Sequence, residues 1–160
     1  MVQAEQTGKW KAYLSYSDVQ DVEQGSGNII YVLASNNIYS YNTADQSIQT
    51  FDKTNGLSDC NISHISYNKS AKRLVIIYSN QNIDLMDDND NVVNISDYYN
   101  SSITSDKTIN DVCQSAGSAY LSTGFGIVKL NVANAEISDT YNLGFKVDYS
   151  YLDSEYIDRK

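Results

Sequence analysis

Residues 31–41 read Tyr-Val-Leu-Ala-Ser-Asn-Asn-Ile-Tyr-Ser-Tyr, and this stretch decides the fold that the sequence predicts. Two short runs of aromatic and β-branched residues flank a small polar turn, a pattern typical of a β-hairpin. The same pattern returns at 74–86 and again at 119–130. The second strand of each hairpin opens with an isoleucine, and these isoleucines, 45 and 44 positions apart, are Ile38, Ile83 and Ile127. A repeat of roughly 40–50 residues with several strands in each unit is typical of β-propeller blades.

The segments around each hairpin extend the repeat to four strands. An apolar pair, three positions apart, opens each unit, and these pairs are Val19/Val22, Ile62/Ile65 and Ile109/Val112. A polar turn after each hairpin leads to an outer strand, at 47–51, 92–95 and 136–141. The sequence therefore predicts an all-β fold, a partial, open β-propeller of about three four-stranded blades. Blade 1 is expected within residues 17–59, blade 2 within 60–108 and blade 3 within 109–144.

Both ends of the chain extend beyond these three units. Residues 9–16 alternate large and polar side chains and predict an orphan strand within an N-terminal segment, 1–16. Residues 145–160 read as the start of a truncated fourth blade. Because a propeller needs at least about four blades to close, we expect this chain to be a piece of a longer protein.

The charge of the chain excludes some classes of partner. The formal net charge is −9 and the isoelectric point is about 4.3. Nucleic acids and anionic membranes are bound through clustered Lys and Arg, so neither is an expected partner. No apolar run approaches the ~20 residues of a membrane-spanning helix. Polar residues follow Met1 directly, so the chain itself shows no secretory signal peptide.

The residues that could carry chemistry are few and isolated. His64 is the only histidine, and a lone imidazole is a poor metal ligand or triad member, so we interpret it as structural. Cys60 and Cys113 fall at places of the repeat too far apart for a disulfide, and we expect two free or buried thiols. No nucleophile–base pair appears, so we expect no enzyme activity, no cofactor and no metal site.

Two short motifs look functional but have simpler explanations. The run Asp87-Asp88-Asn89-Asp90-Asn91 resembles a calcium loop in its alternating oxygen ligands. An EF-hand would, however, place Gly at Val92 and Glu at Tyr98, so a solvated hairpin turn is the better interpretation. Gly124-Phe125-Gly126 joins two expected strands, whereas a phosphate-binding loop leads into a helix, so its glycines serve a tight hairpin.

Tyr98 and Tyr99 are the candidate ligand-binding residues. They lie in the long polar segment 96–108 between blades 2 and 3, where tyrosine rings could stack on sugar rings. The alternative is ordinary packing, in which Tyr buries its ring and leaves its hydroxyl in water.

Several motifs carry a resemblance to a known family. They are the opening Trp10-Lys11-x-Tyr13, the blade signatures at 30–35 and 120–127, and the linker Asp52-Lys53-Thr54-Asn55-Gly56-Leu57-Ser58-Asp59. Together they resemble the N-terminal propeller of PorZ-like proteins of Bacteroidetes, which are accessory factors of type IX secretion. The repeats are also similar to the two-component regulator propeller units of periplasmic sensors in hybrid histidine kinases.

This resemblance implies a function outside the cytoplasm, in the periplasm or at the outer membrane or cell surface. It implies a non-enzymatic interaction module of a larger exported protein, which binds a protein or glycan partner. The alternative is a periplasmic ligand-sensing propeller of a hybrid two-component system.

The open ends of a three-bladed fragment lead to one further expectation. Each end exposes a strand edge and an apolar blade face, which favours pairing with another chain. We therefore expect a homodimer through the exposed blade ends, with 9–16 or 145–157 as segments that two copies could exchange.

Overall fold

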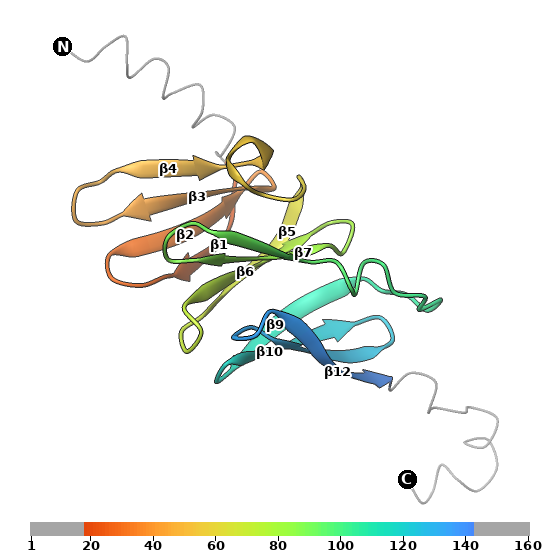
Figure 1. The fold of residues 1–160 in the computed structure, drawn as a ribbon. Helices are drawn as coiled ribbons and strands as arrows, with labels where there is room; N and C mark the ends of the chain where they lie inside the picture. Colours follow the sequence, from red (N-terminus) through yellow and green to blue (C-terminus); the bar gives the residue numbers. More distant parts are fainter. Residues whose placement is uncertain (1–17, 143–160) are drawn as a thin grey trace, which may run out of the picture.

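The computed structural model describes residues 18–142, which form three four-stranded antiparallel sheets stacked as successive blades (Figure 1). Blade 1 consists of β1 (Val19–Gln24), β2 (Ile29–Ala34), β3 (Asn37–Asn42) and β4 (Ile48–Phe51). Blade 2 consists of β5 (Ile62–Asn68), β6 (Arg73–Tyr78), β7 (Ile83–Asp87) and β8 (Val92–Ile95). Blade 3 consists of β9 (Ile109–Ser115), β10 (Ser118–Thr123), β11 (Gly126–Asn131) and β12 (Glu136–Asn142).

This architecture confirms the predicted all-β, open propeller of three four-stranded blades. Strands follow one another across each sheet in sequence order. The first strands, β1, β5 and β9, each form one edge of their sheet, and β5 lies next to both β1 and β9. The orphan strand predicted at 9–16 and the fourth blade predicted from 145 onward lie outside the described residues. One element was not predicted, a short 3-10 helix at Lys53–Asn55 between blades 1 and 2.

The middle sheet is apolar on both faces because another sheet covers each of them. Strand β6 carries the run Leu74-Val75-Ile76-Ile77-Tyr78, and these five side chains are fully buried. Alternate side chains of a strand point to opposite faces. Leu74, Ile76 and Tyr78 accordingly pack against blade 1, whereas Val75 and Ile77 pack against blade 3. A continuous apolar run, with no polar alternation, is thus what this central position requires.

The sheet of blade 3 buries one face and keeps the alternating pattern, whereas β2 of blade 1 is buried continuously from Tyr31 to Ala34. In β10, Ala119 and Leu121 are fully buried against blade 2, whereas Tyr120 and Ser122 point to the other face. Strand β11 repeats this, because Val128 is fully buried and its neighbour Ile127 is only partly covered. The two apolar cores of the molecule therefore lie between the sheets.

In each blade the same backbone hydrogen bond anchors the turn of the central hairpin, which joins the second and third strands. The amide that follows the second strand donates to a carbonyl just before the first strand of its own blade. The pairs are Ser35 to Asp18 at 2.9 Å, Ser79 to Asn61 at 2.8 Å and Gly124 to Thr108 at 3.2 Å. All three hairpin turns are consequently held on one side of the stack, next to the linkers that join the blades.

His64 links the first strands of blades 2 and 3, which are β5 and β9. Its Nε2 lies 3.0 Å from the carbonyl oxygen of Asn110 in β9, and its Nδ1 lies 3.0 Å from the Ser63 hydroxyl. The structural interpretation of this histidine is confirmed, because its ring reaches the neighbouring blade.

We expect His64→Ala to lower the free energy of unfolding by about 1 kcal/mol, because the Asn110 carbonyl loses its inter-blade donor. Urea denaturation at neutral pH measures this, with Lys69→Ala in an exposed turn as the control. Identical midpoints for His64→Ala and the control would contradict an inter-blade role.

Candidate functional site

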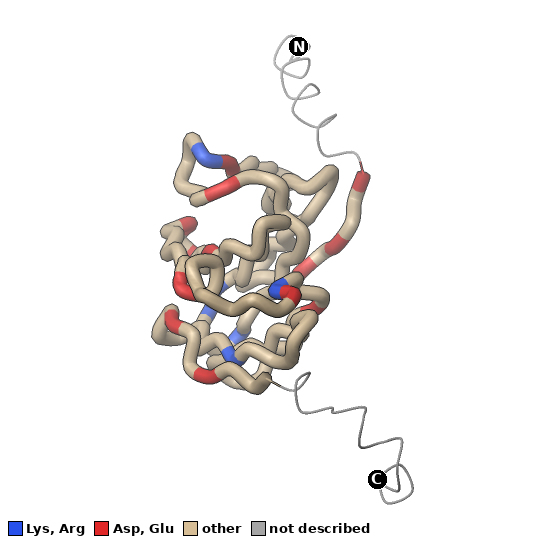
Figure 2. The backbone as a smooth tube through the Cα atoms, turned by 90° about the vertical axis from the view of Figure 1, so that its right-hand side faces the viewer, with Lys and Arg blue, Asp and Glu red and all other residues tan. Residues whose placement is uncertain are grey.

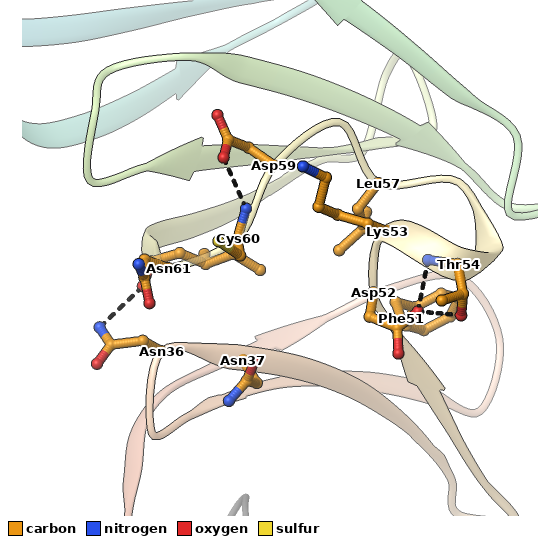
Figure 3. A pocket seen from close by; sticks show the side chains of 11 residues that line it. Asn36, Asn37, Phe51, Asp52, Lys53, Thr54, Leu57, Asp59, Cys60 and Asn61 are labelled. Atoms are coloured by element: carbon orange, nitrogen blue, oxygen red, sulfur yellow. Dashed lines mark hydrogen bonds between the residues drawn. The ribbon is translucent and has the colours of Figure 1, made fainter.

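A pocket of about 310 Å³ opens between the hairpin turn of blade 1 and the linker to blade 2 (Figure 3). We call residues 52–61 the blade 1–2 linker. The turn contributes Asn36 and Asn37, and the ends of the flanking strands contribute Phe51 and Ile62. The linker supplies the remaining lining residues, which are Asp52, Lys53, Thr54, Leu57, Asp59, Cys60 and Asn61.

Backbone geometry fixes the turn side of the pocket. Ser35 and Asn36 both adopt positive φ, 51° and 62°, as a two-residue hairpin turn requires. Asn36 then bridges to the next blade: its carbonyl accepts from the Ile62 amide at 2.9 Å, and its side-chain Nδ2 donates to the Ile62 carbonyl at 3.1 Å. These two hydrogen bonds attach the turn of blade 1 to the first strand of blade 2 and hold this wall in place.

The linker side begins with the capped 3-10 helix. The Asp52 carboxylate accepts from the Thr54 amide at 2.8 Å, and the Asn55 side chain accepts from the Asp52 amide at 2.6 Å. Gly56 follows with φ 120°, a conformation that other residues adopt only with strain. This capping box turns the chain back so that Leu57 enters the core.

Asp59 organises the far wall. Its Oδ2 accepts from the Asn80 side chain at 2.6 Å, and its Oδ1 accepts from the Cys60 amide at 2.9 Å. The hydrogen bond from Asn80, together with the Cys60 amide and the nearby Lys53 ammonium, holds the pKa of Asp59 below its usual range. Asp59 is therefore an anionic acceptor at neutral pH.

The pocket combines an apolar floor with polar groups that remain available. Phe51, Leu57 and Ile62 are almost completely buried beneath it. Figure 3 shows the Lys53 side chain extending over Leu57, with its ammonium toward Asp59. Within the described residues, no hydrogen bond or ion pair within 4.0 Å engages the Lys53 ammonium or the Asn61 side chain. A ligand could thus use one cation and one amide without breaking contacts already made.

The size and chemistry of the pocket limit the ligand. Ligand pockets usually span about 300–1,000 Å³ and combine apolar walls with a few polar groups. At about 310 Å³ this pocket suits one sugar ring or one side chain of a partner. Figure 2 shows acidic positions distributed over strands and turns of the described chain, with the few basic ones scattered among them. The site is therefore better suited to a hydroxyl-bearing, uncharged group than to a polyanion.

The acidic run after β7 is a hairpin turn, as interpreted from the sequence. Asp87 Oδ1 accepts from the amides of Asn89 and Asn91 at 2.8 and 2.9 Å. Asp88 accepts the Tyr67 hydroxyl at 2.8 Å, and Asp90 accepts the Gln49 amide at 3.2 Å. Among residues 18–142, no three His, Cys, Asp or Glu side chains are grouped so as to hold a metal ion. Cys60 and Cys113 are free and exposed.

The structure separates the two tyrosines that were predicted to bind a ligand. Tyr98 is only 3% exposed; its ring stacks on Phe125 at a centroid distance of 6.4 Å, and its hydroxyl donates to the Lys107 carbonyl at 2.6 Å. The packing of segment 96–108 against blade 3 has buried the Tyr98 ring, which favours the packing alternative for this residue. Tyr99 is 46% exposed, and ligand binding there stays a prediction.

The buried phenols predict a loss of stability at alkaline pH. Burial raises the pKa of Tyr98 from 10.0 to about 12 and also raises the pKa values of Tyr31 and Tyr78. An acid with a raised pKa in the folded state stabilises the fold below the unfolded pKa and loses this contribution as the pH rises. We expect the urea midpoint to fall between about pH 10 and about pH 12.

Denaturation at stepped pH, with tyrosinate absorbance recorded in parallel, measures this effect. Tyr98→Phe should weaken the pH dependence, because one of the buried phenols can no longer ionise. A midpoint that stays constant across this range would contradict the burial of these three hydroxyls.

Sequence reasoning missed the pocket residues although two of its signals were visible. The turn Ser35-Asn36-Asn37 was recognised as a hairpin turn, and the linker from Asp52 onward as a connection between blades. The sequence was not used to infer that the hairpin turn and the linker lie on the same side of the stack in every blade. The contact of Asn36 with Ile62, 26 positions away, brings them together.

The comparisons with known proteins identify the fold and a family. A family model described as the N-terminal β-propeller domain of PorZ, of the type IX secretion system, matches residues 30–159. A solved structure of PorZ from Porphyromonas gingivalis, described as an essential bacterial surface component of that system, is 33% identical with a TM-score of 0.74. The match covers 79% of this chain but only 17% of that protein.

Two more distant structures share the fold alone. The extracellular domain of a protein assigned as a hybrid two-component system of B. thetaiotaomicron is 15% identical, with a TM-score of 0.61, over 79% of this chain and 17% of that one. AztD from Citrobacter koseri is 15% identical, with a TM-score of 0.60, over 78% of this chain and 33% of that one. No curated protein matches the sequence. Within the described residues no helix is long and apolar enough to cross a membrane.

Proposed function

Because this chain belongs to the family of PorZ N-terminal β-propeller domains, we propose that it is an exported interaction module that binds a glycan through the pocket between blade 1 and the blade 1–2 linker. The observation that carries the proposal is the apolar floor of Phe51, Leu57 and Ile62 beneath the free Lys53 ammonium and Asn61 amide. Sugars present apolar C–H faces and hydroxyls together, so this combination of groups complements one sugar ring.

The proposed location follows the same relative. The PorZ protein of P. gingivalis is described as a bacterial surface component, and we propose a cell-surface or periplasmic location for this chain as well. In the proposed role the propeller binds and positions a partner and catalyses no reaction.

The alternative is a periplasmic sensor domain of a two-component system. Its support is the structural likeness to the extracellular domain from B. thetaiotaomicron, which at 15% identity concerns the fold alone. The 33% identity to PorZ and the family match over residues 30–159 favour the PorZ-type role. The pocket is the proposed binding site under either role.

The test begins with a glycan array of neutral and acidic oligosaccharides probed with the purified chain. Calorimetry then measures the selected oligosaccharide against Lys53→Ala. We expect about 10- to 150-fold weaker affinity for this variant, since a lost hydrogen bond from a charged group is worth about 1.5–3 kcal/mol. Cys60→Trp, which places a large side chain at the pocket rim, should abolish binding.

Lys69→Ala is the matched control, because Lys69 is an exposed lysine in the β5–β6 turn, away from the pocket residues. Equal affinities of Lys53→Ala and Lys69→Ala would contradict this site. If the array selects nothing and a protein partner is captured instead in a Cys60-sensitive manner, the pocket is a protein-binding site and the glycan proposal fails.

A further inference from the structure

One side of the pocket between blade 1 and the blade 1–2 linker carries two opposite charges. The Lys53 ammonium extends toward Asp59 in Figure 3, and its charge contributes to the lowered pKa of the Asp59 carboxyl. A ligand group with a net charge is attracted by one of these two groups and repelled by the other. This side of the pocket therefore favours a ligand group that is uncharged but dipolar.

The other side of the pocket carries an amide. The Asn61 side chain is exposed and lies away from Lys53 in Figure 3. Its backbone is fixed by blade 2, because the Asn61 carbonyl accepts from the Ser79 amide at 2.8 Å and from the Ser79 hydroxyl at 2.9 Å. The main chain is thus held in place, while the side-chain amide offers a ligand one acceptor and one donor group.

The apolar floor lies beneath these polar groups. Phe51, Leu57 and Ile62 form it, and all three are almost completely buried. A ligand hydroxyl placed on such a surface loses its hydrogen bonds to water without gaining a partner. A methyl group in the same place gains free energy by leaving water. The floor therefore selects for an apolar substituent.

A secondary amide that ends in a methyl group matches all three features at once. A trans amide is planar, and its carbonyl and its N–H point in opposite directions. The carbonyl can accept from the Lys53 ammonium on one side, while the N–H donates to the Asn61 side chain on the other. The methyl group then rests on the floor. A free amine would be repelled by Lys53, and a carboxylate would be repelled by Asp59.

We propose that the pocket recognises the N-acetyl group of an acetamido sugar, and that Lys53 and Asn61 select this group. The inference rests on the proposed function, because it narrows the glycan to sugars in which an acetamido group replaces one hydroxyl. A plain hexose can still place its ring in the pocket, but it has no planar amide to bridge the two polar sides and no methyl group for the floor.

Calorimetry with matched pairs of oligosaccharides tests the inference. Each pair consists of an acetamido sugar and the hexose with a hydroxyl at the same carbon, in the gluco, galacto and manno configurations. We expect at least one acetamido member to bind about tenfold or more tightly than its hexose partner, because a site that bonds a ligand group rejects an analogue without it. The de-N-acetylated amine of the same sugar should bind no more tightly than the hexose.

Asn61→Gly measures the contribution of the amide to this preference. Glycine adopts the φ of 62° found at this position without strain. The preference for the acetamido member should fall about 2- to 12-fold, the value of one neutral hydrogen bond, with the hexose affinity nearly unchanged. Lys72→Gly is the matched control, because Lys72 is exposed at φ 55° in the β5–β6 turn, away from the pocket residues.

The outcomes separate this inference from the proposed function. Equal affinities within every pair, with binding still weakened by Lys53→Ala, would overturn the inference and leave the glycan site standing. An equal loss for both members of a pair in Asn61→Gly would give Asn61 a structural role and overturn its part in selection. If no oligosaccharide binds, the proposed function fails and the inference fails with it.

Discussion

Asp84→Ala is expected to lower the free energy of unfolding by about 3–5 kcal/mol, because three hydrogen-bond donors lose their acceptor and each donor left unsatisfied in the interior costs about 1–3 kcal/mol. The Asp84 side chain is fully buried in β7. Its Oδ2 accepts the Tyr78 hydroxyl at 2.5 Å and the Ser58 amide at 2.8 Å, and its Oδ1 accepts the Asn94 side chain at 2.9 Å. Alanine leaves all three donors without this acceptor.

The same substitution should also affect the pocket. Ser58 lies in the blade 1–2 linker, directly before Asp59, so the Asp84–Ser58 hydrogen bond holds one end of the pocket wall on blade 2. We therefore expect the folded Asp84→Ala variant to bind the ligand more weakly than the folded wild type.

Urea denaturation of wild type, Asp84→Ala and Asp97→Ala at pH 7 measures the effect. Asp97 is an exposed aspartate in the next linker and is the matched control. Because small proteins are stabilised by only about 5–15 kcal/mol, Asp84→Ala removes a large part of the total. A difference below about 1 kcal/mol between the two variants would show that the network contributes little.

Leu85→Ala is expected to lower the free energy of unfolding by about 2–5 kcal/mol. Leu85 is fully buried on the face of blade 2 that packs against blade 3. Truncation removes its apolar contacts and leaves a cavity between two sheets that cannot readily approach, since β7 is hydrogen-bonded to both β6 and β8. The loss should therefore lie in the upper part of this range.

Val93→Ala is the control for this substitution, because Val93 is the cross-strand neighbour of Leu85 on β8 but is 40% exposed. Thermal and urea denaturation of the two variants should give clearly separated midpoints. Equal midpoints would mean that blade 3 is not packed on blade 2 through this face.

Much of the fold could be predicted because the apolar and polar residues of each blade follow a pattern that is visible within that blade's own sequence. The alternation in β10 and the continuous run from Leu74 to Tyr78 follow directly from covering one face or two. The hairpin turns could also be predicted from the sequence, since Ser35 and Asn36 are small or polar residues that tolerate positive φ.

The candidate site was less predictable because it depends on contacts between distant segments. Nothing local in Asn36 reveals that its side chain reaches Ile62 in the next blade. The burial of Tyr98 was not predicted for a related reason: segment 96–108 is polar overall, yet Lys107 and Phe125 surround this one ring. Tyr99, its neighbour in sequence, is exposed to solvent. Exposure within an irregular segment is decided by tertiary packing, which composition does not contain.

The most direct test of the proposed site is a ¹H–¹⁵N correlation spectrum of the labelled chain, titrated with the oligosaccharide that the array selects. The account predicts that the largest shift changes occur at the amides of Asn36, Lys53 and Asn61, with Tyr99 unaffected. Shift changes centred on Tyr99 and the surrounding residues 96–108, with the pocket amides unmoved, would contradict it.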